Sequence, residues 1–156
     1  MTIFGLLLAS LSSFFFATNT WNGITPLKST RTDVENILGK RNPDSKATDA
    51  ASYTTKNEKV FVIYSGGNCN IKLNGGWNVE KGKVISISVY PKIPLKFADY
   101  KFDKTKFSSY VEDYVIITTY TNKTDGIGFS VNTEEETIGY LAYFPKSEDD
   151  YLLCEK

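Results

Sequence analysis

A short segment near the N-terminus carries the signals of both ends of a helix, whereas the apolar segments that follow it have the pattern of strands. Thr30 is a typical N-cap with Asp33 as its capping-box partner, and Gly39 supplies a left-handed C-terminal stop. Between these signals runs one apolar stripe of Val34, Ile37 and Leu38. Because this stripe needs a sheet to cover, the sequence predicts an α+β fold, with a short N-terminal helix packed on an antiparallel sheet of about five to seven strands.

The strand segments are rich in β-branched and aromatic residues and are separated by polar turns. They comprise residues 59–64, 84–90, 114–120, 127–131 and 137–144, with a short edge piece expected at 151–154. Residues 84–90 alternate cleanly, so the face of this strand that points to the helix should carry Ile85, Ile87 and Val89. Tyr90 lies on the opposite face.

Trp77 precedes a polar turn at residues 80–83, and this order predicts a hairpin between residues 77–79 and 84–90. A large aromatic residue at this place either plugs the core or forms an exposed contact. Trp77 and Tyr90 are therefore the candidates for a contact surface.

The chain opens with an apolar and small-residue run that ends at Ala17 and has the character of a secretory signal peptide. The run is too short for a membrane span, which needs about 20 apolar residues. The alternative is a buried N-terminal strand or helix. The sequence thus predicts a signal peptide at residues 1–17 and a single domain at residues 18–156. We expect this domain to be secreted or periplasmic, with no membrane association after cleavage.

Two long segments lack a clear period. Residues 40–57 are polar and contain Pro43, which indicates an exposed connection, either a variable loop or one that could adapt to a partner. Residues 95–113 interleave aromatic residues with lysines, so they either form a long crossover pinned to the core or stack on single-stranded nucleic acid. Export favours the crossover, and the zero formal net charge of the chain gives no reason to expect nucleic acid as a partner.

The sequence contains two cysteines, Cys69 in a glycine-rich loop and Cys154 close to the C-terminus. In an exported protein the simplest expectation is that they form a disulfide, and two free thiols are the alternative. The pairing predicts Cα atoms less than about 7 Å apart. It also predicts that the tail at residues 151–154 docks beside the loop at residues 65–70.

The residues that usually carry chemistry are sparse. The absence of histidine excludes the usual Ser-His and Cys-His nucleophile pairs and the histidine-containing zinc sites. The loop at residues 65–68 lacks the Gly-Lys-Ser/Thr ending of a phosphate-binding loop, and the acidic run at 134–136 lacks the spaced ligands of a calcium loop. We therefore expect no catalytic residues, no cofactor and no metal. Asn122 and Thr124 match an N-glycosylation acceptor.

The order of several short motifs resembles an uncharacterised family of small secreted bacterial proteins. The matching motifs are Trp21-x-Gly-Ile-x-Pro-Leu-x-Ser-Thr-Arg31-x-Asp-Val34, Leu38-Gly39, Tyr64-Ser-Gly-Gly, Cys69, Gly76-Trp-Asn-Val79, Ser86-Ile-x-Val-Tyr-Pro-Lys92 and Cys154. Residues 29–39 alone are also similar to the helix of the SmpA/OmlA outer-membrane-assembly lipoproteins and of the β-lactamase-inhibitor-like fold. This second likeness implies helices packed on an antiparallel sheet, and the first family implies no activity.

These observations predict an exported, non-catalytic protein that binds another protein through an exposed part of its sheet. The alternative is a secreted hydrolase or carbohydrate-active protein that uses carboxylates and exposed aromatic residues. A deep pocket lined by acids of raised pKa would favour the enzyme, whereas a flat, open sheet with exposed aromatic residues would favour the binding protein.

Overall fold

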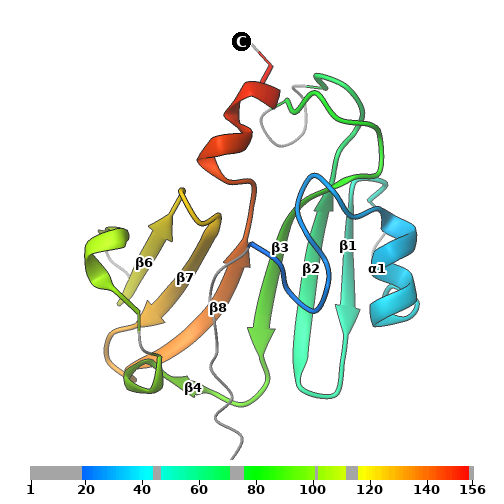
Figure 1. The fold of residues 1–156 in the computed structure, drawn as a ribbon. Coiled ribbons are helices and arrows are strands. Elements are labelled where there is room, and N and C mark those ends of the chain that lie inside the picture. The colour runs from blue at the N-terminus through cyan, green and yellow to red at the C-terminus, as the bar shows by residue number, and fades with distance from the viewer. Residues whose placement is uncertain (1–18, 44–46, 71–75, 101, 112–115, 155–156) are drawn as a thin grey trace, which may run out of the picture.

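The computed structural model describes residues 19–43, 47–70, 76–100, 102–111 and 116–154. The predicted signal peptide at residues 1–17 lies outside this part of the chain. Within it, one α-helix accompanies eight strands of a single sheet whose pairings are all antiparallel (Figure 1). The strands are β1 (Ala50–Thr54), β2 (Glu58–Tyr64), β3 (Val84–Pro91), β4 (Leu95–Lys96), β5 (Ser108–Val111), β6 (Ile117–Asn122), β7 (Ile127–Asn132) and β8 (Thr137–Tyr143).

The sheet consists of two halves that meet at β3 and β8. The strand order is β1-β2-β3-β8-β7-β6-β5, and the short β4 pairs with β8. Ile87 lies opposite Tyr143, and Val89 lies opposite Leu141. The α+β expectation is confirmed, but the expected five to seven strands were too few, because the short strands β1, β4 and β5 lie in segments assigned to connections.

The helix α1 (Arg31–Leu38) has the predicted ends. Thr30 Oγ1 accepts a hydrogen bond from Asp33 N at 3.2 Å, and Asp33 Oδ2 accepts one from Thr30 N at 2.7 Å. The helix is not the first element on the sheet, because an arm at residues 19–30 precedes it. Its apolar stripe is narrower than predicted: Val34 is buried, whereas Ile37 remains 46% exposed.

One face of the sheet carries two hydrophobic clusters. The first lies over β1–β3, where the arm and α1 cover it (Figure 1), and it comprises Ile24, Val34, Ala51, Tyr53, Val60, Val62, Tyr64, Val84, Ile87, Val89 and Tyr143. The second cluster centres on Phe129, Val131 and Ile138 of β7 and β8. Leu141 packs against both clusters, so the two cores are continuous on this face.

Aromatic residues of the connection between β4 and β6 cover the second cluster. This connection contains the 3₁₀ turns η1 (Phe97–Asp99) and η2 (Lys104–Lys106). The Phe102 ring lies 4.8 Å from that of Phe129, centroid to centroid, and Tyr120 stacks on Phe129 at 5.0 Å. The prediction of a crossover pinned to the core by its aromatic residues is therefore confirmed.

The strand β3 follows the predicted alternation except at its first two residues. Ile87 and Val89 are buried in the first cluster, while Tyr90 on the other face is 43% exposed. The pairing with β2 shifts register between Ile63 and Tyr64, so Ser86 pairs with Ile63 but Val84 pairs with Tyr64. This bulge leaves Ile85 between the two pairs and allows both Val84 and Ile85 to be buried.

Two local predictions were wrong. Residues 77–79 do not form a hairpin with β3, because Trp77 instead forms a β-bridge with Leu153 near the C-terminus. The segment predicted as an exposed connection contains β1, in which Ala51 and Tyr53 are fully buried. In both places a partner distant in sequence determines the structure.

Candidate functional site

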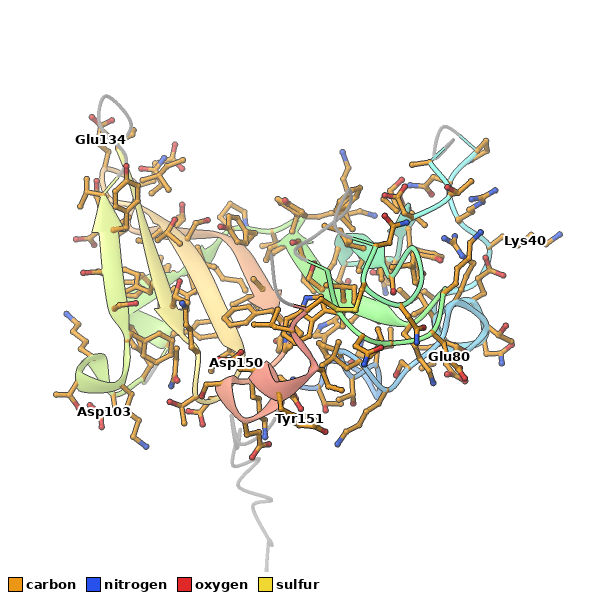
Figure 2. The ribbon with its side chains drawn as sticks, turned by 90° about the horizontal axis from the view of Figure 1, so that it is seen from above. Lys40, Glu80, Asp103, Glu134, Asp150 and Tyr151 are labelled. Carbon is orange, nitrogen blue, oxygen red and sulfur yellow. A yellow bond between two sulfur atoms is a disulfide. The ribbon has the colours of Figure 1, made fainter. Side chains whose placement is uncertain are left out.

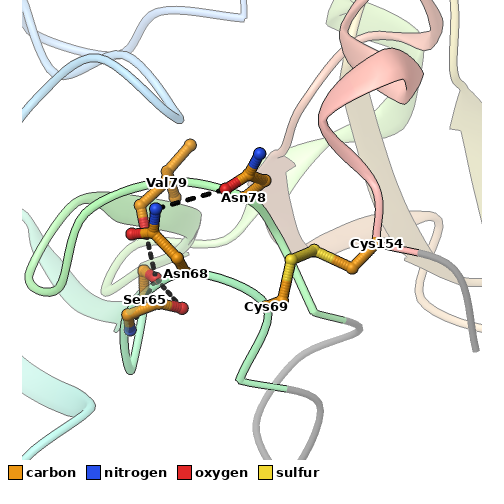
Figure 3. Close-up of a disulfide and its surroundings, with 7 residues drawn as sticks. Ser65, Asn68, Cys69, Asn78, Val79 and Cys154 are labelled. Atoms are coloured by element: carbon orange, nitrogen blue, oxygen red, sulfur yellow. Dashed lines mark hydrogen bonds between the residues drawn. A yellow bond between two sulfur atoms is a disulfide. The ribbon is translucent and has the colours of Figure 1, made fainter.

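The disulfide ties the C-terminal tail to the loop that follows β2. Cys69 and Cys154 are bonded with their Cα atoms 5.5 Å apart, which confirms the predicted pairing (Figure 3). The tail docks on residues 76–78 rather than directly along residues 65–70. Asn78 N donates to Leu152 O at 2.8 Å and Cys154 N donates to Gly76 O at 2.8 Å, while Cys69 N donates to Trp77 O at 3.0 Å. Residues 76–78 are therefore hydrogen-bonded both to the loop at Cys69 and to the C-terminal tail.

The loop at residues 65–69, residues 76–78 and the tail at residues 152–154 together form the disulfide lobe. Hydrogen bonds from side chains reinforce this lobe. Ser65 is buried, and its Oγ accepts a hydrogen bond from Gly67 N at 3.0 Å. Asn68 Nδ2 donates to Asn78 Oδ1 at 3.2 Å (Figure 3). The lobe is therefore held by the disulfide together with hydrogen bonds across its loops.

The two predicted contact residues lie at opposite ends of β3. Trp77 belongs to the disulfide lobe, which adjoins the start of β3 through the hydrogen bond from Ser65 N to Lys83 O. Tyr90 lies near the other end of the strand and pairs with Lys59. Trp77 is half-buried and Tyr90 is exposed. They therefore do not form one surface.

Tyr90 belongs to a face of the sheet on which the side chains of β2 and β3 all remain partly or fully exposed. We define the open face as Lys59, Phe61, Ile63, Ser86, Ser88, Tyr90 and Tyr140. Phe61 is 39% exposed, and the Tyr90 and Tyr140 rings lie 5.7 Å apart between centroids. The sequence showed the alternation of β3, but the contributions of Phe61 and Tyr140 depend on strand pairing and were missed.

A pocket of about 250 Å³ opens on the opposite face of the sheet. It lies where the two hydrophobic clusters meet, because Tyr143 of the first cluster and Phe129 of the second both line it. Tyr100, Phe102 and Phe107 of the crossover supply further aromatic walls, and among the described residues its polar lining includes Asp103, Lys106, Asn122 and Asp125. The sequence does not reveal this pocket, because its walls come from separate segments.

The polar residues of the pocket are arranged by local turns. Asn122 Nδ2 donates to Asp125 Oδ2 at 2.7 Å, and Asn122 Oδ1 accepts a hydrogen bond from Asp125 N at 3.0 Å. Asp103 Oδ1 accepts hydrogen bonds from the hydroxyl and the backbone N–H of Thr105, and these lower the pKa of the Asp103 carboxyl. Asp103 is therefore suited to remain ionised rather than to donate a proton.

The glycosylation match at Asn122 does not describe an accessible acceptor. The side chain is only 3% exposed, and its amide nitrogen is bonded to Asp125. A glycan on Asn122 would require this turn to open.

No helix in the described ranges is long and apolar enough to cross a membrane. Within the same ranges, no three residues of the types His, Cys, Asp and Glu come together as a potential metal site. No protein-family model, no curated protein and no solved structure matches this chain.

Proposed function

We propose that this is an exported, non-catalytic protein that binds another protein through the open face. The observation that carries the proposal is the continuous exposure of Phe61, Tyr90 and their neighbours on hydrogen-bonded central strands. A strand platform holds such side chains in place, so little ordering entropy is lost when a partner binds.

The composition of the open face suits a protein partner. Tyrosines provide large contact areas with few rotatable bonds, and serines such as Ser86 and Ser88 provide adaptable hydrogen bonds. Three exposed lysines, Lys56, Lys59 and Lys92, lie at the Tyr90 end of this face, where Lys92 Nζ donates to the backbone of the β1–β2 turn. We therefore expect the partner surface to have an apolar centre and an acidic border.

Export is supported by the disulfide, because such bonds persist mainly in oxidising compartments. Cleavage of the predicted signal peptide would give a chain that begins near residue 18. Mass measurement of the protein recovered from outside the cytoplasm tests this part of the proposal, and an intact Met1 would contradict it.

A secreted hydrolase or carbohydrate-active protein is the second candidate, since the pocket contains two carboxylates. The lowered pKa of Asp103 is opposite to what a general acid needs. Asp103 therefore lacks the raised pKa that would favour the enzyme.

Site-specific crosslinking tests the protein-binding proposal. A photoreactive amino acid replaces Tyr90 in one protein and Tyr151 in a control, because Tyr151 is 80% exposed on η3 (Ser147–Leu152) and outside the open face (Figure 2). In extracts of the protein's own source, position 90 should crosslink to one discrete partner that position 151 does not capture. Phe61→Ser should abolish this capture, and thermal unfolding shows whether the variant is still folded. Equal capture from both positions would refute the proposal.

A further inference from the structure

The pocket has an aromatic interior and a polar mouth, and the open face does not share its lining. The rings of Phe102 and Phe107 meet edge to face at 5.2 Å, and the Phe107 ring lies 5.4 Å from that of Phe129, centroid to centroid. Such rings offer apolar contact and the negative potential of their faces. An apolar or cationic group is therefore the most favourable occupant of the interior.

The mouth contains a fixed carboxylate. Asp125 is half-buried, its Oδ2 accepts a hydrogen bond from Asn122 Nδ2, and its backbone N donates to Asn122 Oδ1, so Asn122 positions both the carboxylate and the turn that carries it. Among the described residues, only one of its oxygens has a hydrogen-bond partner, so Asp125 Oδ1 can accept a bond from a ligand. A carboxylate oriented before binding loses less entropy on pairing than a free surface side chain does.

Asn122 is itself a buried polar group with hydrogen-bonding capacity left. A carboxamide has two N–H donors. In the described part of the chain, Asn122 Nδ2 donates only to Asp125, although the side chain is 97% buried and lines the pocket. Asn122 therefore adds a second polar group to the pocket lining beside Asp125.

We propose that this pocket binds a compact organic amine, whose apolar body enters the ring-lined interior and whose ammonium group pairs with Asp125. In the described part of the chain, the charged side chains that line the pocket are two carboxylates, Asp103 and Asp125, and one ammonium, that of Lys106, and this excess of negative charge supports a cation. The cavity of about 250 Å³ suits a compact ligand, because it is smaller than the roughly 300–1,000 Å³ of pockets that hold drug-sized molecules.

Three probes of one shape separate charge from shape. Phenethylamine, 2-phenylethanol and phenylacetate carry the same ring with a cationic, neutral or anionic end. The binding of each is followed at neutral pH by amide chemical shifts of the full-length, disulfide-bonded protein. Phenethylamine should bind most tightly and should shift the amides of residues 102–107 and 122–129. Equal affinity for the alcohol, or shifts confined to other residues, would overturn the proposal.

Two substitutions should change the affinity for phenethylamine in opposite directions. Asp125→Asn should weaken phenethylamine binding about tenfold, as expected for the loss of a hydrogen bond to a charged group. Lys106→Gln should strengthen the binding, because it removes a like charge from an exposed position at the mouth.

Glu134→Gln is the matched control for Asp125→Asn. Glu134 is an exposed carboxylate on the turn between β7 and β8, far from Asp103 in Figure 2. The substitution makes the same change in net charge and should leave the affinity unchanged. Thermal unfolding of each variant shows whether it remains folded, and unchanged affinity in a folded Asp125→Asn protein would refute the pairing. Because the open face takes no part, these results do not depend on the protein-binding proposal.

Discussion

The hydroxyl groups of Tyr53 and Tyr64 lie 2.8 Å apart inside the first hydrophobic cluster, where both side chains are fully buried. Arg31 from the start of α1 lies over the Tyr64 ring, with its Cζ atom 4.0 Å from the ring centroid. Arg31 Nη2 also donates to Thr48 O at 2.6 Å. The tyrosine pair and the arginine therefore join the helix to the edge of the sheet.

Removal of one hydroxyl from this pair should cost more than removal of both. Tyr64→Phe leaves the Tyr53 hydroxyl buried without its partner, and we expect a loss of about 1–3 kcal/mol in the free energy of unfolding. The double variant with Tyr53→Phe leaves no hydroxyl unpaired and should recover part of that loss. Urea unfolding of the two single variants and the double variant gives the coupling energy, and additive losses would contradict the pairing.

Buried tyrosines should make the protein unstable at alkaline pH. Burial raises the pKa of Tyr143 to about 12 and also raises the pKa values of Tyr53, Tyr64 and Tyr100. These hydroxyls stay protonated in the folded state, whereas the unfolded chain ionises near the ordinary pKa of about 10. The stability that results from this difference in pKa is fully present below about pH 10, and it is lost as the pH rises further.

The test compares the unfolding midpoint of the protein and of Tyr143→Phe between about pH 8 and about pH 11. The variant should lose less stability over this range, because one raised pKa has been removed. Lysines titrate in the same range but are common to both proteins. Identical slopes would show that Tyr143 ionises equally in both states.

Opening the disulfide should destabilise the fold and release its tail. The bond links residues separated by 85 positions, and the chain-entropy model assigns such a loop about 4–5 kcal/mol. The double variant Cys69→Ser with Cys154→Ser should show this loss in urea unfolding. Hydrogen exchange should then accelerate at the backbone amides of residues 78 and 154, which bond the tail to residues 76–78. Retained protection there would mean that hydrogen bonds alone hold the tail.

The sequence predicted correctly those elements whose structure depends on residues close together in the chain. The capping box of α1 needs only Thr30 and Asp33, and the alternation of β3 is visible in seven consecutive residues. β1 was missed because its two buried residues, Ala51 and Tyr53, lie among polar neighbours. Burial of Tyr53 becomes favourable only when Tyr64 supplies a partner for its hydroxyl.

The candidate sites show the same limit. The disulfide could be predicted because the chain has only two cysteines, so only one pairing was available. The pocket could not, since Phe102, Asp125 and Tyr143 come together only after β8 has paired with both β3 and β7. The open face was half predicted: Tyr90 was found by alternation, while Phe61 was missed because residues 60–64 are all apolar or aromatic, so their pattern does not show which face is open.

Positions 126 and 39 both favour glycine, but for different physical reasons. Gly126 has a φ of +67°, which favours glycine, and an added Cβ would clash with the carbonyl oxygen of Phe144 and lie 2.9 Å from the Cβ of Asn19. Gly39 has a φ of +83° but nothing within 4 Å of an added Cβ, so Gly39→Ala reports backbone strain alone. We expect Gly39→Ala to cost about 1 kcal/mol and Gly126→Ala at least about 2 kcal/mol more, because Phe144 N also bonds to Gly126 O and this backbone has little room to move. Thermal unfolding of both variants decides the matter: equal losses would show that the contact among Asn19, Gly126 and Phe144 relaxes freely, and that the arm is not anchored to the sheet at this point.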